Sequence, residues 1–325
     1  AAASATGAAV TAPAPAPAAA RAHVLVIVGA SGEPQYAAAF HEAALAVADA
    51  ARGRFGLGDD QVTYLGEDPG RAPGRIAARA TREAVERMLG ELARRTRPGD
   101  AVWIVLVGHG SAQGDVPRFN LPGPDLTAAD FARLLAPLAG RRVAFVNTAS
   151  ASGGFARALA APGRAIVTAT KSGTERNETR FARHFAAALA APGADLDKDG
   201  GVSLLEAYGY ARREVARAYE AENRLLTEHA QLDDDGDGVA TAEPTEATRD
   251  GRLAAALVLG GAAASGDPRV AALVARRREL EQQVAALRSR RTTMDSAQYA
   301  ARLESLLVEL ARAAQAVRAA EGARP

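Results

Sequence analysis

The sequence predicts an α/β protein in which helices cover both faces of a mostly parallel sheet, forming a three-layer sandwich. From Arg21 onward, short apolar runs such as His23–Val28 alternate with longer segments rich in Ala, Arg and Glu. The apolar runs are continuous, which is typical of strands buried on both faces of a parallel sheet. Hydrophobic residues make up 48% of the 325 residues, enough to build a substantial core.

The apolar runs define the expected strands in order along the chain. They are His23–Val28, Val62–Leu65, Ala101–Val107, Val143–Val146 and Ala165–Ala169, with a sixth at Leu253–Leu259. The segments between the strands have helical composition and spacing. They predict helices at Ala37–Arg54, Thr81–Arg95, Ala128–Leu138, Phe155–Ala160 and Thr179–Ala190.

Composition divides the chain into three parts. Residues 1–20 alternate Ala and Pro, which favours extended conformers and predicts a linker. Residues 21–264 form the α/β domain, and residues 265–325 predict a helical hairpin. The hairpin has apolar residues at three- and four-residue spacing, namely Leu273, Leu280, Val284, Leu287, Leu303, Leu306, Leu310 and Val317. It either packs within the chain or forms a homo-oligomer or partner surface.

Charge and cysteine content exclude several classes of protein. The 39 Lys and Arg balance 38 Asp and Glu, so no overall field attracts nucleic acid. The chain contains no cysteine, which excludes disulfides, thiolate metal sites and a cysteine nucleophile. No apolar run approaches the ~20 residues of a membrane-spanning helix. The start of the chain resembles that of a mature protein after signal-peptide removal, so we expect a secreted or periplasmic location.

Polar, Gly- or Ser-rich segments follow four of the expected strands. Because ligands bind beyond the carboxyl ends of parallel strands, these segments predict the functional site. His109 follows the third strand in "VGHGS", between glycines that we expect to admit a substrate backbone. Ser150 and Ser152 follow the fourth strand in "NTASASGGF". If the two strands are neighbours, the histidine and the serines lie side by side.

These motifs resemble those of the legumain and caspase-type cysteine peptidases, over roughly residues 21–190. The resemblance implies a caspase-like fold and a peptide or protein ligand. It places His109 at the catalytic histidine and Ser150 where the family has its nucleophilic cysteine. It also implies that the residues lining the site or its oxyanion hole are Gly110, Ser31, Ser152 and Gly153.

The serine in place of cysteine leaves three functions open. A hydroxyl needs an adjacent general base to act as a nucleophile, so the first interpretation is a peptidase-like protein that binds peptides or partners without cutting them. The second is a serine-type endopeptidase that uses His109 and Ser150. The third is an α/β-hydrolase-type esterase with Ser152 on a nucleophile elbow. In each case the charged loop with Lys171, Glu175 and Arg176 is a candidate for reading the substrate.

Two acidic segments predict calcium binding. The first acidic loop, residues 195–206, fits the twelve-position calcium loop of EF-hands, with oxygen ligands at Asp195, Asp197, Asp199, Gly201, Ser203 and Glu206. The second acidic loop, residues 233–244, repeats the spacing with Asp233, Asp235, Asp237 and Thr241, but Pro244 occupies its twelfth position. We expect Ca²⁺ to act as a structural ion in these loops.

Overall fold

A computed structural model describes residues 20–260, 268–289, 291 and 294–322, so most of the expected linker 1–20 lies outside the described residues. Its centre is a sheet of seven strands in the order β11-β9-β8-β4-β1-β2-β3. Six strands are parallel, and only β11 at one edge runs antiparallel. The strands span Ala22–Val28 (β1), Val62–Gly66 (β2), Ala78–Arg79 (β3), Ala101–Val107 (β4), Arg142–Asn147 (β8), Arg164–Thr168 (β9) and Gln231–Asp233 (β11).

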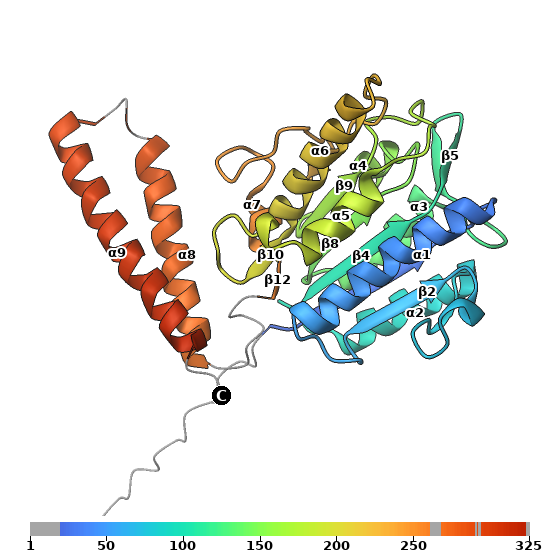
Figure 1. Cartoon of the computed structure of the whole chain (residues 1–325), viewed down its shortest axis with the longest axis horizontal. Coiled ribbons are helices and arrows are strands. Elements are labelled where there is room, and N and C mark those ends of the chain that lie inside the picture. The colour runs from blue at the N-terminus through green and yellow to red at the C-terminus, as the bar shows by residue number, and fades with distance from the viewer. Residues whose placement is uncertain (1–19, 261–267, 290, 292–293, 323–325) are drawn as a thin grey trace, which may run out of the picture.

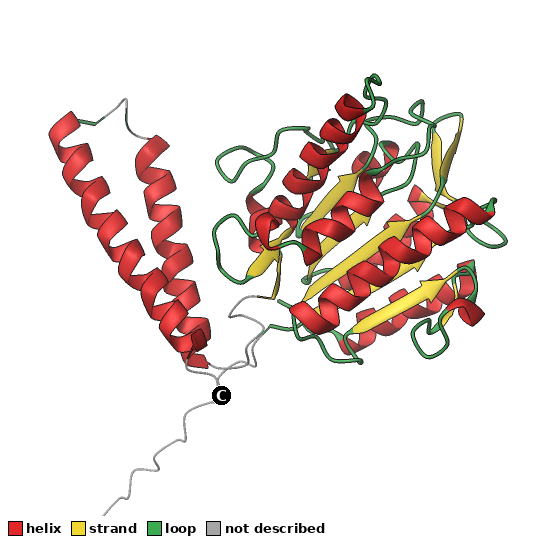
Figure 2. Ribbon diagram, in the orientation of Figure 1, coloured by secondary structure: helices red, strands yellow, loops and turns green. Residues whose placement is uncertain are grey.

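The apolar strands are buried on both faces, as their continuous hydrophobicity predicts. Successive residues of β1 belong to different cores: Val24 and Val26 face one layer of helices, whereas Leu25 and Ile27 face the other. Figure 2 shows helices on both faces of the sheet. The expected three-layer α/β arrangement with a mostly parallel sheet is therefore confirmed.

The helices divide between the two faces. One face carries α1 (Pro34–Asp49), which continues as a π-helical turn over Ala50–Arg54, together with α5 (Phe181–Ala190) and α6 (Leu204–Ala221). The other face carries α2 (Arg82–Arg95), α3 (Ala128–Leu135) with a 3₁₀ turn over Ala136–Leu138, and α4 (Gly154–Leu159). All five predicted helices are present, with ends within three residues of those expected.

The sixth predicted strand, Leu253–Leu259, is wrong. Most of this segment forms the short helix α7 (Arg252–Ala256), because the Asp234 carboxylate accepts hydrogen bonds from the backbone N–H groups of Gly251 and Ala254 at the helix start. The strand β12 (Val258–Gly260) pairs with β10 (Gly201–Ser203) in a separate two-stranded sheet. The hydrogen bonds from Asp234 therefore favour a helix over a strand in this segment.

Three short strands follow β4, where the sequence predicts only a loop. They are β5 (Gly110–Gln113), β6 (Val116–Phe119) and β7 (Leu126–Thr127), and they form an antiparallel sheet with β6 in the middle. The sheet folds back over the carboxyl ends of the central strands, where the Ala30 N–H donates to the Asn120 carbonyl and the Asn120 N–H donates to the His109 carbonyl. It therefore covers part of the edge at which the functional site is expected.

The C-terminal residues form two helices, α8 (Pro268–Ser289) and α9 (Ser296–Gly322), which we call the hairpin. Figure 1 shows them side by side next to the α/β body. Val274 of α8 and Val317 of α9 pack together with Leu273 and Ala320 in a cluster of their own. Over the described residues, none of the helices has the length and apolar character to cross a lipid bilayer.

Candidate functional site

The predicted site residues come together at one edge of the sheet. The strands β1, β4, β8 and β9 are neighbours and parallel, so the segments that follow them meet at the carboxyl edge. The five longer parallel strands follow the spatial order 2-1-3-4-5 of doubly wound folds, and the order reverses between β1 and β4. This edge, with the loops after those four strands, is the strand-end site.

His109 lies on the α1 side of the sheet. Its ring packs edge-on against Tyr36 at 4.8 Å and Phe40 at 5.0 Å between ring centroids. Among the described residues, the imidazole has no hydrogen-bond partner. The aromatic residues of α1 therefore hold the ring by packing, and no neighbouring acid orients it as a general base.

Ser150 is bonded to backbone atoms of the loop that carries His109. Its hydroxyl donates to the Gly110 carbonyl at 3.1 Å and accepts from the Gly110 N–H at 3.4 Å. The side chain is only 4% exposed. The proton that a nucleophilic serine must give up is thus held by a carbonyl oxygen, which cannot act as a base at ordinary pH.

The turn after Ser150 is strained. Ala151 has a φ of 52°, in the left-handed region that residues with a Cβ seldom adopt. Its N–H donates to the Glu175 carbonyl at 2.7 Å, which holds the turn in place. Strain of this kind occurs at nucleophile turns of hydrolases, so it is the feature of this edge that most resembles an active site.

Ser152 is a buried structural residue of the strand-end site. Its hydroxyl lies 3.1 Å from the Thr170 hydroxyl and accepts from the Thr170 N–H at 3.2 Å. The Gly153 N–H donates to the same Thr170 hydroxyl at 3.1 Å. These bonds join the loops after β8 and β9, and Ser152, 1% exposed, faces Thr170 and not a histidine.

Glycines at this edge make room for neighbouring loops, which corrects the expectation that they admit a substrate. An ideal Cβ at Gly110 would lie 2.2 Å from the Ser150 carbonyl oxygen, and one at Gly153 would lie 2.2 Å from the Lys171 carbonyl carbon. At Gly29 the obstacle is the Asn120 carbonyl oxygen at 2.3 Å. The space beside each glycine is already filled by backbone, so a substrate cannot occupy it.

The loop after β9 braces the site. The Glu175 carboxylate accepts from the backbone N–H groups of Lys171 and His229, and one oxygen lies 2.6 Å from the His229 Nδ1. Its side chain is 11% exposed, whereas Lys171 and Arg176 are more open to solvent. Glu175 therefore supports the turn at Ala151 from inside the protein.

Ser31 lies in the loop after β1. It is buried, and its N–H donates to the Glu67 carboxylate.

The first acidic loop lies between α5 and α6, at a distance from the strand-end site. Asp195, Asp197 and Asp199 each place a carboxylate oxygen within 4.8 Å of the others, so the cluster could hold a metal ion. Their other bonds shape the loop: the Asp195 carboxylate accepts the N–H groups of Asp199 and Gly200, and Gly200 adopts a φ of 81°.

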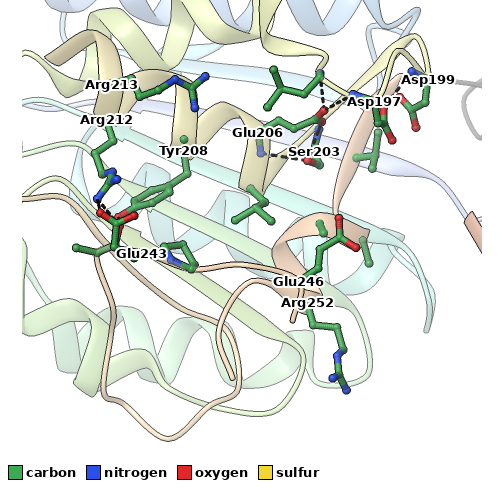
Figure 3. A pocket seen from close by; sticks show the side chains of 18 of the residues that line it. Asp197, Asp199, Ser203, Glu206, Tyr208, Arg212, Arg213, Glu243, Glu246 and Arg252 are labelled. Carbon is green, nitrogen blue, oxygen red and sulfur yellow. Dashed lines mark hydrogen bonds and ion pairs between the residues drawn. The ribbon is translucent and has the colours of Figure 1, made fainter. Parts of the chain in front are cut away.

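Glu206 ties the two ends of the first acidic loop together. One carboxylate oxygen accepts from the Leu196 N–H at 2.8 Å, and the other accepts from the Ser203 N–H and hydroxyl. Figure 3 shows Glu206 beside Ser203 at one side of a cavity of about 470 Å³. On the other side Arg212 pairs with Glu243. The predicted carboxylate at the twelfth loop position thus bonds the backbone beside the aspartates, but it is not among the carboxylates that lie within 4.8 Å of one another.

The second acidic loop starts on the edge strand β11 and not after a helix. Asp233, Asp235 and Asp237 again bring carboxylate oxygens within 4.8 Å of one another. Asp233 is fully buried, and its Oδ2 has no hydrogen-bond partner in the described part of the chain. Burial raises the pKa of Asp233 to about 6. Thr241 pairs through its backbone with Leu232, so the turn is closed by a bridge instead of a twelfth-position ligand.

Two arginines that the sequence analysis did not single out lie on the acidic loops. Arg249 pairs with Asp235 and Asp237 at 2.9 and 2.8 Å. Arg277 of α8 pairs with Asp197 and Asp199 at 3.1 and 3.5 Å. Asp197 and Arg277 are 80 positions apart. No spacing rule joins such distant residues, so only the folded chain reveals the pair.

Comparisons with known proteins give no family for this chain. Neither the family models nor the curated proteins include a match. Among solved structures, protein GSU0716 from Geobacter sulfurreducens is 16% identical with a TM-score of 0.44, over 72% of this chain and 99% of its own. Chaetomium thermophilum Raptor is 10% identical with a TM-score of 0.36, over 55% of this chain and 19% of its own.

Proposed function

We propose that this chain is an extracytoplasmic, calcium-binding protein of the legumain/caspase type that binds peptides or protein partners at its strand-end site without cutting them. The bonding of Ser150 is the observation that carries the proposal. Its hydroxyl donates to the Gly110 carbonyl, while the His109 ring packs on Tyr36 and Phe40. The two groups that would have to exchange a proton are each engaged elsewhere.

Peptide binding is supported by the strand that follows His109. β5 is an edge strand of the small antiparallel sheet, with β6 on one side only. An extended peptide can add to such an edge through main-chain hydrogen bonds, with side chains alternating between two faces. The exposed Lys171 and Arg176 lie on the loop after β9, where they would meet acidic groups of the ligand.

Calcium binding is supported by the oxygen ligands of both acidic loops. The first acidic loop offers three aspartates, the Gly201 carbonyl, Ser203 and Glu206, the number and kind of ligands that a hard cation of this size prefers. In the second acidic loop, the buried Asp233 Oδ2 lacks a partner that a cation would supply. Calcium is abundant outside the cytoplasm, which agrees with the expected secreted or periplasmic location.

A serine-type endopeptidase is the second candidate, because of the strained turn at Ala151. A φ of 52° at an alanine costs on the order of 1–2 kcal/mol, and the Glu175 carbonyl maintains it directly after Ser150. Rotation of the Ser150 hydroxyl away from Gly110 would then be the first step of activation.

Cleavage of a diverse peptide mixture, followed by mass spectrometry, separates the two candidates. The protein and its Ser150→Ala and His109→Ala variants are compared with calcium and with a chelator, and Ser305→Ala on the exposed face of α9 serves as the control. We expect no cleavage above the buffer background in any sample. Cleavage that disappears in both site variants and persists in the control would establish the peptidase and refute the proposal.

The calcium part of the proposal has a separate test. Isothermal titration of the unmodified protein is compared with that of Asp195→Asn combined with Asp197→Asn, and with that of Asp235→Asn combined with Asp237→Asn. We expect each pair of substitutions to remove one binding event. Absence of a heat of binding in the unmodified protein at two temperatures, with the fold shown intact by circular dichroism, would refute calcium binding.

A further inference from the structure

A positively charged side chain of the hairpin, that of Arg277, lies in the first acidic loop. The guanidinium of Arg277 lies 3.1 Å from Asp197 Oδ2 and 3.5 Å from Asp199 Oδ2. The side chains of Arg277 and Asp199 are both only 3% exposed. The pair is thus buried, and it joins the α/β body to a segment outside it.

Arg277 and the loop backbone face different oxygens of the two aspartates. Asp197 Oδ1 accepts from the Asp199 N–H at 3.0 Å, and Asp199 Oδ1 accepts from the Gly201 N–H at 2.7 Å. The Oδ2 atoms of both aspartates are the ones that face the guanidinium. A metal ion held by all three aspartates needs an oxygen from each, and two of the three residues already neutralise Arg277.

We propose that Arg277 and a divalent cation compete for the first acidic loop, so that cation binding releases the hairpin from the α/β body. The inference rests on the proposed calcium binding and names its regulation. A guanidinium and a dication at the same carboxylates repel each other, and this repulsion is strongest at Asp199, which is buried together with Arg277. By linkage, the cation weakens docking of the hairpin by the same factor by which docking weakens cation affinity.

The hairpin has packing and ion pairs of its own. Its apolar cluster of Leu273, Val274, Val317 and Ala320 includes no residue of the body among those described. The neighbouring Arg276 pairs within the hairpin, with Glu279 of its own helix and Glu309 of α9. Release of Arg277 therefore leaves the packing of α8 against α9 intact.

The second acidic loop provides an internal contrast. Arg249 pairs with Asp235 and Asp237, which hold the same third and fifth loop positions as the partners of Arg277. Its side chain is 76% exposed and lies only 14 residues from Asp235. A cation can displace this arginine into solvent without moving another element, so the coupling to the hairpin belongs to the first loop alone.

Calcium titration of the full chain tests the competition. The background carries Asp235→Asn and Asp237→Asn, so that only the first loop binds, and Arg277→Ala is compared with Arg276→Ala, an exposed neighbour on the same helix. We expect Arg277→Ala to tighten calcium binding by about tenfold or more, because it removes the competitor, and Arg276→Ala to leave it within about twofold. Arg277→Gln, which keeps the length and loses the charge, guards against a folding defect and should act in the same direction.

Equal or weaker calcium affinity in both Arg277 variants would overturn the inference while leaving calcium binding in place. Absence of calcium binding in the unmodified protein would refute the proposed function itself. The two failures are therefore distinct.

The position of the hairpin is the second measurement. Because the chain has no cysteine, spin labels can be placed on Glu220→Cys in α6 and Ser305→Cys in α9 alone, both at exposed positions. We expect saturating calcium to broaden and shift the distance distribution, and Arg277→Ala to do so without calcium. A distribution that calcium leaves unchanged at saturation would overturn the release.

Discussion

Replacing Gly110 by alanine tests whether the strand-end loops are as tightly packed as the structure has them. The new Cβ would lie 2.2 Å from the Ser150 carbonyl oxygen and 3.1 Å from the Arg118 carbonyl oxygen. A relaxed carbon–oxygen contact is about 3.3 Å, so the loop after β8 must move by about 1 Å. Gly110 is not among the glycines with positive φ, so the steric clash alone sets the cost.

The expected loss of stability follows from two terms. Overpacking of a well-packed site costs about 1–3 kcal/mol, and displacement of the loop weakens the two hydrogen bonds between Ser150 and Gly110, at about 1 kcal/mol each. We therefore expect the free energy of unfolding to fall by about 3 kcal/mol, a large part of the stability of a typical domain.

The assay is urea unfolding, with Gly90→Ala as the matched control. Gly90 lies inside α2, and an ideal Cβ there meets only the Arg94 guanidinium, at 3.5 Å. Because alanine is about 1 kcal/mol better than glycine in a helix, the same substitution should stabilise the protein at this position. A Gly110→Ala variant as stable as the unmodified protein would refute the close approach of the two loops, and would return the glycine to a role in admitting ligand.

Three further predictions follow from buried groups and from the acidic loops. Ser152→Ala leaves the buried Thr170 N–H without its acceptor and should destabilise the protein by about 1–3 kcal/mol in urea unfolding. The exposed Ser305→Ala should change stability by less than about 0.5 kcal/mol. Equal effects would contradict the hydrogen bond between Ser152 and Thr170. Burial lowers the pKa of His23 below the unfolded value of about 6.5. Its contribution to stability is therefore complete above that pH and is lost as the pH falls through the folded pKa. His23→Leu should reduce the pH dependence of the free energy of unfolding between about pH 7 and pH 5, and an unchanged pH dependence would contradict the prediction. Calcium at 100 times its Kd should stabilise the fold by about 2.7 kcal/mol per occupied loop, seen as a rise in Tm that a chelator reverses; a Tm indifferent to both would exclude a structural ion.

Local patterns were sufficient for most of the α/β body. The continuous apolar runs predicted the five long parallel strands, since strands covered on both faces carry no alternation. Composition predicts where a helix starts to within a few residues. A capping residue such as Thr81, whose side chain accepts from the Ala84 N–H, marks the start itself. The error at Leu253–Leu259 arose because its helix is anchored by Asp234, a contact that no local pattern records.

The sequence by itself determined the fold class, the edge at which His109 and Ser150 lie, and the two aspartate clusters. All of these depend on spacing within one element or on the rule that the carboxyl ends of parallel strands meet. Only the tertiary structure decided what those residues do there. The Ser150 hydroxyl bonds to Gly110 and not to His109, and Arg277 reaches the first acidic loop from 80 residues away. Hydrogen bonds and ion pairs between distant segments depend on ångström-scale positions, which the packing of the whole chain sets.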